Sequence, residues 1–356
     1  MARLVRAAVA ILLALGWVQG VAAAPPSDAY LAGYVAAVLE REFGLQNVAI
    51  DVAEGTVTVR GEGLDDAARG RIVRALTGIQ GVTAVAVAEP ARPVPREERG
   101  RLATGFLRPG RLFDPLLADP RWPHFSAAYQ RYLGDADFKD VAAVSFGETI
   151  SLYRWDAPWK GQLETGLQAS VFALFDLDTE SHELINADYF VGFYGAHRYR
   201  DLQLLARVYH QSSHLGDEFL LRSRVSRVNL SYEAVDVKGS WDLLDGALRP
   251  YLGGGILFDR EPADLARGFV QYGLEFRSPW TLAHGTLVPI AAVDIGQREE
   301  NGWRLDLSAR AGVQFQALQV YGRSLAVMLE YFNGHSPNGQ FFSQEIDYVG
   351  IGVHLY

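Results

Sequence analysis

From about residue 122 to the end of the chain, apolar and polar residues alternate with a period of two. In residues 159–175 and 303–315 the odd positions are mainly apolar, whereas many of the even positions are polar or charged. A period of two places the two sets on opposite faces of a β-strand. The second half of the chain is therefore predicted to be built from long strands.

The length and chemistry of these runs favour a membrane barrel over a secreted β-sandwich with one wet face. They exceed the usual five or so residues of soluble strands and match the roughly 9–11 residues of a tilted membrane strand. The polar face carries full charges, such as Arg304, Asp306 and Arg310. We therefore expect a mainly β fold in which residues 121–356 form an antiparallel transmembrane barrel with a polar lumen and an apolar outer band.

About twelve segments of this kind are present, an even number that places both ends of the barrel in the periplasm. The turns at 156–158 and 200–201 are short, as periplasmic turns are, and segments 214–224, 260–267 and 333–346 are long and polar, as external loops are. The last segment, DYVGIGVHLY, ends on Tyr356 and resembles the closing-strand signal read by the barrel-insertion machinery, an expected partner during biogenesis. The strands are expected to begin near residues 123, 141, 159, 186, 202, 225, 248, 268, 287, 303, 323 and 347.

Residues 1–24 have the features of a secretory signal peptide. Arg3 and Arg6 precede an apolar stretch, and three alanines at 22–24 close the segment. The apolar run is shorter than the roughly 20 residues that a transmembrane helix needs. We therefore expect cleavage after about Ala24 and export of the remainder.

The composition excludes several classes of site and partner. The chain has no Cys, so it holds no disulfide, thiolate metal site or cysteine nucleophile. Removing Arg3 and Arg6 from the 33 basic residues leaves 31 against 42 acidic residues, a net charge of −11. An acidic chain without a basic run argues against nucleic acid as a partner.

Residues 27–88 predict a small α+β domain with the order αββαβ. Helical spacing of apolar residues precedes the strand-like pattern VAIDVAEGTVTVRGEGLDD, and a second helix leads into LTGIQGVTAVAV. These two phrases resemble the BON domain of bacterial envelope proteins. The resemblance implies a periplasmic module that contacts phospholipid or other envelope components and has no catalytic role. Residues 89–120, rich in Pro and charge at their start, are expected to be a linker.

The segment RVYHQSSHLGDE, residues 207–218, is the candidate chemical site. His210 and Ser212 continue the parity of the apolar residues before them, so both are expected to point outward near the outer leaflet. A His two residues from a Ser on one face suits activation of a serine nucleophile. The segment resembles the outer-membrane phospholipase A family, in which a His-Gln-Ser run supplies base and nucleophile. The resemblance implies a lipid acyl hydrolase with Ser212 as nucleophile and His210 as base.

In that family the third catalytic residue is an Asn on the next strand, which matches Asn229 in order. Val228, Leu230 and Tyr232 read as the lipid face there, so Asn229 is expected to point inward unless a bulge turns it, and Ser226 is the alternative orienting residue. Asp217 and Glu218, just beyond the serine, are candidate Ca²⁺ ligands, although an ordinary solvated acidic loop fits them as well. No cofactor is otherwise required.

The barrel half also resembles an outer-membrane family defined only as a domain of unknown function. The phrases that carry this resemblance are FDPLLADPRWPHFSAAYQRY, YHQSSHLGDEF, NLSYE and YFNGHSPNGQFF. Two functions follow as hypotheses. The chain is a barrel that its soluble module docks to envelope lipid or other envelope components, or it is an acyl hydrolase of phospholipid or lipid A. A small channel is a third hypothesis, weakened by the large charged residues expected in the lumen.

Overall fold

The computed structural model describes residues 28–45, 49–53, 55–60, 66–88, 101–134, 138–223, 225–283, 286–320 and 322–356. The predicted signal peptide and the first part of the predicted linker lie outside these residues. The chain divides into two compact units, residues 1–94 and 95–356. Among the described residues, no helix is long and apolar enough to cross a membrane.

The first unit confirms the predicted αββαβ order. Its three-stranded sheet has the order β1-β2-β3, in which β1 and β2 are antiparallel and β2 and β3 are parallel. Gly55 adopts a φ of +76° in the turn between β1 and β2, and a Cβ there would meet the Gly81 carbonyl oxygen at 2.6 Å. The core consists of Val35, Leu39, Val57, Val59, Ile72 and Leu76. The elements are α2 (Asp28–Phe43), β1 (Ala49–Ala53), β2 (Thr56–Arg60), α3 (Asp66–Thr77) and β3 (Ala84–Ala88).

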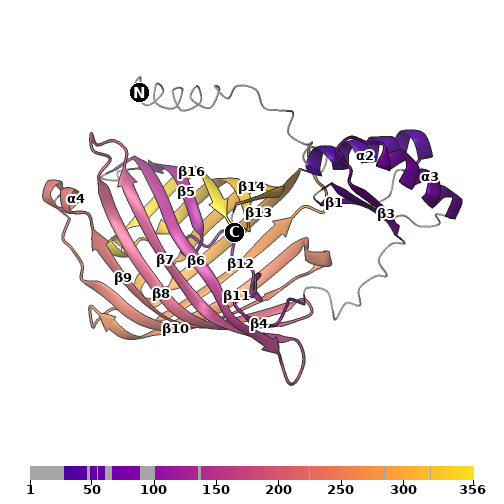
Figure 1. The fold of residues 1–356 in the computed structure, drawn as a ribbon. Helices are drawn as coiled ribbons and strands as arrows, with labels where there is room; N and C mark the ends of the chain where they lie inside the picture. The colour runs from indigo at the N-terminus through magenta and orange to yellow at the C-terminus, as the bar shows by residue number, and fades with distance from the viewer. Residues whose placement is uncertain are drawn as a thin grey trace. The chain divides into compact units, whose positions relative to one another are not determined.

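The second unit is a closed barrel of twelve antiparallel strands, β5 to β16, as the sequence predicts (Figure 1). Consecutive strands pair with each other, and β16 pairs with β5 to close the ring. A two-residue strand, β4 (Gly105–Phe106), adds to the edge of β6. The barrel strands are β5 (Phe125–Leu133), β6 (Asp140–Asp156), β7 (Gln162–Asp176), β8 (Leu184–Tyr199), β9 (Leu202–Leu215), β10 (Leu230–Trp241), β11 (Leu248–Glu261), β12 (Gly268–Arg277), β13 (Leu287–Arg298), β14 (Leu305–Val320), β15 (Arg323–His335) and β16 (Glu345–Leu355).

The barrel wall has its apolar residues outside and its charged residues inside, the reverse of a soluble protein. Apolar residues such as Phe193, Leu252 and Ile351 are at least half exposed on the outside. Charged residues such as Arg154 and Glu164 are fully buried inside. This arrangement fits a wall whose outer surface meets lipid and whose interior satisfies its polar groups internally. The barrel is therefore of the outer-membrane type.

The lumen is occupied by residues 107–122, which we call the plug segment. Its backbone contacts polar side chains from strands all around the ring. Leu112 N donates to Glu164 of β7 at 3.4 Å, and Leu117 N donates to Glu275 of β12 at 2.6 Å. Arg310 of β14 donates to the Leu117 carbonyl at 2.9 Å. A chain that reaches three such separated strands must pass through the interior.

The plug segment differs from the sequence-based expectation, which assigns residues up to 120 to a linker. Leu112, Phe113, Leu116 and Trp122 are buried in a cluster with lumen-facing residues of β8, β9 and β11. Burying large apolar residues away from water is favourable, and the lumen-facing side chains of the barrel bury these four. Because buried charges hold the plug by hydrogen bonds to its backbone, an open pore is not expected.

Candidate functional site

β9 directs His210 and Ser212 to the outer wall, as the sequence predicts. Tyr209 and Gln211, the residues that alternate with them, are buried in the lumen. His210 and Ser212 are half-buried, between the exposed outward side chain of Val208 and the long loop that follows β9. Both candidate residues therefore face the surroundings of the barrel and not its interior.

The structure pairs His210 with Glu233, a residue that the sequence analysis does not identify. The two residues are direct cross-strand partners on β9 and β10. His210 Nδ1 lies 2.8 Å from Glu233 Oε1, and both side chains are about 40% exposed. A carboxylate that accepts a hydrogen bond from Nδ1–H fixes the ring and leaves Nε2 as the nitrogen available for proton transfer. This is the orientation that a histidine base requires.

Ser212 lies one pleat further along the same face of β9. Its cross-strand neighbours are Ser231 on β10 and Tyr189 on β8. Two residues of a strand rise by roughly 6.6 Å, and within the described part of the chain Ser212 Oγ makes no hydrogen bond to His210. Catalytic hydrogen bonds are often long without substrate and tighten when it binds. The structure thus places Ser212 beside the His210–Glu233 pair, without a hydrogen bond between Ser212 and His210.

Asn229 and Ser226, the predicted orienting residues, lie in the exposed segment before β10. The expectation that Leu230 and Tyr232 face lipid is wrong, because both are buried in the lumen with Phe190 and Tyr209. The interior is apolar at this level, so apolar residues here do not mark the outer face. Asn229 consequently shares the outward parity of Ser231 and Glu233, but it lies four residues from the partner of His210.

Asp217 and Glu218 form the first turn of the short helix α4 (Asp217–Arg222). Both are exposed, and Glu218 Oε2 accepts a hydrogen bond from Ser181 at 2.8 Å. Ca²⁺ usually takes six to eight oxygen ligands, and the described residues hold no group of three or more His, Asp or Glu suited to a metal ion. These two carboxylates do not by themselves fit a calcium site, and they remain a prediction.

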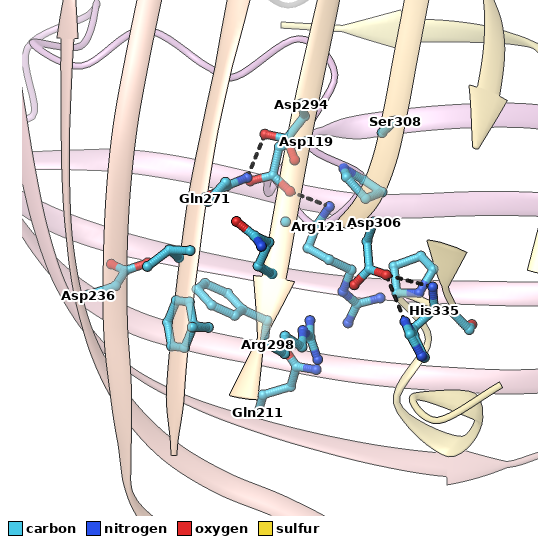
Figure 2. A pocket seen from close by; sticks show the side chains of 18 of the residues that line it. Asp119, Arg121, Gln211, Asp236, Gln271, Asp294, Arg298, Asp306, Ser308 and His335 are labelled. Atoms are coloured by element: carbon cyan, nitrogen blue, oxygen red, sulfur yellow. Dashed lines mark hydrogen bonds and ion pairs between the residues drawn. The ribbon is translucent and has the colours of Figure 1, made fainter. Parts of the chain in front are cut away.

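A second polar site lies inside the barrel, in a lumenal cavity of about 120 Å³ (Figure 2). Most of the charged residues that line it are paired with each other. Arg207 binds Asp236 through two hydrogen bonds, and Lys238 Nζ lies 3.3 Å from the same carboxylate. His335 Nδ1 lies 2.9 Å from Asp306. The site therefore combines fixed charges with enough space for a small group.

A smaller cavity of about 80 Å³ adjoins this one and shares Tyr209, Tyr232, Phe269 and Arg298 with it. Near this cavity Glu299 connects the turn after β13 to the start of β12. Glu299 accepts hydrogen bonds from the Gly268 N–H at 2.8 Å and the Arg267 N–H at 3.1 Å. These two bonds stabilise the carboxylate and lower the pKa of Glu299. These bonds fix the position of the loop before β12 against the turn after β13.

Several solved structures are similar to this chain in fold. The outer-membrane phospholipase of Salmonella typhi, a dimer with bound calcium, is 12% identical with a TM-score of 0.46, covering 67% of this chain and 94% of that one. Outer-membrane phospholipase A from Escherichia coli is 10% identical with a TM-score of 0.46, covering 69% and 95%. LpxR from Salmonella typhimurium is 11% identical with a TM-score of 0.33, covering 65% and 99%. At these sequence identities the similarity shows the fold and gives no information about activity.

At the level of sequence, no curated protein matches the chain. One family does, and the match covers residues 89–356, which include the plug segment and the whole barrel. The matched region is well over half of the chain. The chain belongs to the family described as Protein of unknown function (DUF1207).

Proposed function

We propose that this outer-membrane barrel is a serine acyl hydrolase that acts on lipids of the outer leaflet, with Ser212 as nucleophile, His210 as base and Glu233 as the orienting carboxylate. The observation that carries the proposal is the 2.8 Å contact between His210 Nδ1 and Glu233 Oε1 on the outer wall, beside Ser212. Polar side chains that face lipid are costly and call for a function. A hydrogen-bonded His–Glu pair next to a serine hydroxyl is suited to nucleophilic catalysis, which would be that function.

The depth of the site supports a lipid substrate. Tyr189, the cross-strand partner of Ser212, is about half exposed on the outer wall. Tyrosines on the outside of membrane proteins concentrate at the level of the lipid headgroups. Ester bonds of phospholipid and of lipid A lie just below that level. The proposal accordingly places the long-loop end of the barrel, with α4, on the cell exterior.

The chemistry follows from the three side chains. His210 Nε2 takes the hydroxyl proton of Ser212 while Oγ attacks the ester carbonyl carbon. The resulting imidazolium is stabilised by Glu233, and it returns the proton to the leaving alcohol as the C–O bond breaks. Water then hydrolyses the acyl-serine by the same route and releases a fatty acid. No step is assigned to Ca²⁺, because Asp217 and Glu218 alone do not make a calcium site.

The proposal is tested by fatty-acid release from vesicles that contain phospholipid or lipid A, with the full-length chain inserted in the same membrane. Release is expected from at least one of the two lipids, and the preferred lipid identifies the substrate. The assay is run with and without Ca²⁺. No release from either lipid under either condition would reject the proposal.

A second proposed function concerns the first unit, which resembles a BON domain and which we place in the periplasm. Tyr30 and Tyr34 stack on α2 with ring centroids 6.3 Å apart, and they are 63% and 49% exposed. Exposed aromatic pairs suit contact with a lipid interface or a partner surface. We propose that this face docks the barrel to envelope lipid or to other envelope components.

Vesicle capture tests the docking role. Proteoliposomes that display the first unit should capture protein-free vesicles of phosphatidylethanolamine and phosphatidylglycerol. Changing Tyr30 and Tyr34 together to Ser should abolish capture, because the aromatic contact is lost while the core of the unit is untouched. Equal capture by the two proteins, or no capture by either, would contradict docking to lipid through this face.

A further inference from the structure

Two arginines in the lumenal cavity retain donors that the protein does not use. Arg121 binds Asp188 through Nη1 at 2.9 Å, but its Nε and Nη2 are buried without a hydrogen-bond partner. The side chain of Arg298, at the end of β13, makes no ion pair or hydrogen bond within the described residues. The unmet donors of Arg121 are buried, so they cost free energy unless a ligand or water accepts from them, whereas Arg298 is half-buried and its guanidinium is free to bind a ligand. Figure 2 shows both side chains reaching into the middle of the cavity.

The acidic residues of the cavity do not accept hydrogen bonds from these guanidinium donors, and each accepts from another group of the protein. Asp306 accepts from the backbone N–H of His335 at 2.7 Å, and Asp119 accepts from the backbone N–H of Arg121 at 2.8 Å. Asp294 accepts from Tyr251 at 2.6 Å and from Gln271. It also lies four residues deeper in β13 than Arg298, a separation of roughly 13 Å along the strand. Glu300 also lines the smaller cavity, but its carboxylate accepts a hydrogen bond from the Ala266 backbone N–H at 2.6 Å, so Arg121 and Arg298 supply the unused donors at this end.

An apolar space begins at the same arginine. Arg298 lines both cavities, and the smaller one is otherwise walled mainly by aliphatic and aromatic side chains. Leu230 and Leu265 are almost fully buried there and pack with Tyr232, Phe269 and Phe342. A site with cationic donors at one end and an apolar wall at the other favours a ligand with an anionic group at one end and an apolar group at the other.

We propose that the lumenal cavity binds a small amphipathic anion, whose carboxylate or phosphate group lies between Arg121 and Arg298 and whose short apolar tail lies against Phe269 and Phe342. Guanidinium groups bind both kinds of anionic oxygen with paired hydrogen bonds. This site is distinct from the outer-wall serine, since it lies on the opposite face of the barrel wall.

The test is isothermal titration calorimetry on the full-length chain in a non-ionic detergent. The probes are hexanoate, hexyl phosphate and hexanol, all short enough to remain largely outside the micelles. Saturable binding is expected for at least one of the two anions, and their order of affinity shows whether the head group is a carboxylate or a phosphate. Hexanol, which has the tail without the charge, should bind at least about tenfold more weakly.

Variants localise the binding. Arg298→Gln should weaken binding of the anion by about tenfold or more, because a charged hydrogen-bond donor is lost. Arg298→Lys, which keeps the charge, should recover part of the affinity. Arg304→Gln is the matched control, since Arg304 is 68% exposed, pairs with Glu345 and does not line either cavity. No saturable binding of either anion, full affinity in Arg298→Gln, or hexanol binding as tight as the anions would overturn the proposal.

Discussion

The Glu233→Gln chain is expected to release fatty acid about 10²- to 10⁴-fold more slowly than the wild type, while it still folds as a barrel. Glu233 Oε1 accepts a hydrogen bond from His210 Nδ1 at 2.8 Å and stabilises the imidazolium that forms as Ser212 attacks. An amide at this position cannot compensate that charge, and it can turn its N–H₂ group toward the ring and favour the wrong tautomer. The measurement is the initial rate of fatty-acid release from vesicles at equal amounts of folded protein.

Ser231→Ala is the matched control for this substitution. Ser231 lies on the same strand and the same face as Glu233, and it is the cross-strand neighbour of Ser212. Its hydroxyl has no part in the proposed proton transfer, so the rate should remain within about twofold of the wild type, a difference of less than 1 kcal/mol in the barrier. A wild-type rate in Glu233→Gln, with the barrel folded, would remove Glu233 from the site.

Arg154→Ala is expected to destabilise the barrel by about 3–5 kcal/mol, the usual result of breaking a buried ion pair from one side. Arg154 and Glu164 are both fully buried and bonded to each other. The same guanidinium donates to the carbonyls of Ala103, Pro109 and Gly110 at 2.6–3.2 Å. Its loss leaves a buried carboxylate and three carbonyls without their donor. The free energy of unfolding in urea, followed by tryptophan fluorescence in detergent micelles, measures the effect.

Arg101→Ala provides the comparison for Arg154. Arg101 forms an ion pair with Asp156 at 2.6 Å, but both side chains are 52% exposed. Exposed pairs of this kind contribute at most about 1 kcal/mol. If both variants lost the same small amount of stability, buried charges would not be what holds the plug segment in the lumen.

The barrel is predictable from sequence because its wall follows one rule along its whole length. Residues on β7 and β14 alternate between lipid and lumen, so their period of two gives both the strands and the face that each side chain occupies. The expected starts at residues 202, 248, 268, 287 and 323 coincide with observed strand starts. The remaining starts differ by a few residues, since strand ends depend on loop packing as well as on the pattern.

The plug segment is not predictable in this way, because it has no regular period. Leu112, Phe113 and Leu116 are buried in a cluster with Tyr194, Leu205 and Tyr251, which come from three strands much further along the chain. Only the closed ring brings those strands around them. The Pro and charged residues before this stretch suggest a linker, although the apolar residues in FDPLL indicate that part of it is buried.

The alternation pattern does not point to Glu233 when the apolar residues before it are assigned to the lipid face. Leu230 and Tyr232 are large and apolar, which suggests lipid contact, but they fill the lumen beside Phe190. The outward residues Val235 and Val237, further along the same strand, carry the correct parity. Extending their alternation backwards assigns Glu233 to the outer face beside His210, so the sequence holds a signal for this residue.

The most direct test of the central claim compares fatty-acid release by the wild type and by Ser212→Ala, each inserted at equal density in vesicles of the preferred lipid. The wild type should release fatty acid, and Ser212→Ala should release it at least about 10³-fold more slowly, because the nucleophile is absent. Ser212 of the wild type should also be the residue that a serine-directed phosphonate modifies, as mass spectrometry of the labelled chain would show. Equal release by the two proteins, or a wild type that neither releases fatty acid nor reacts at Ser212, would contradict the assignment of a hydrolase site to the outer wall.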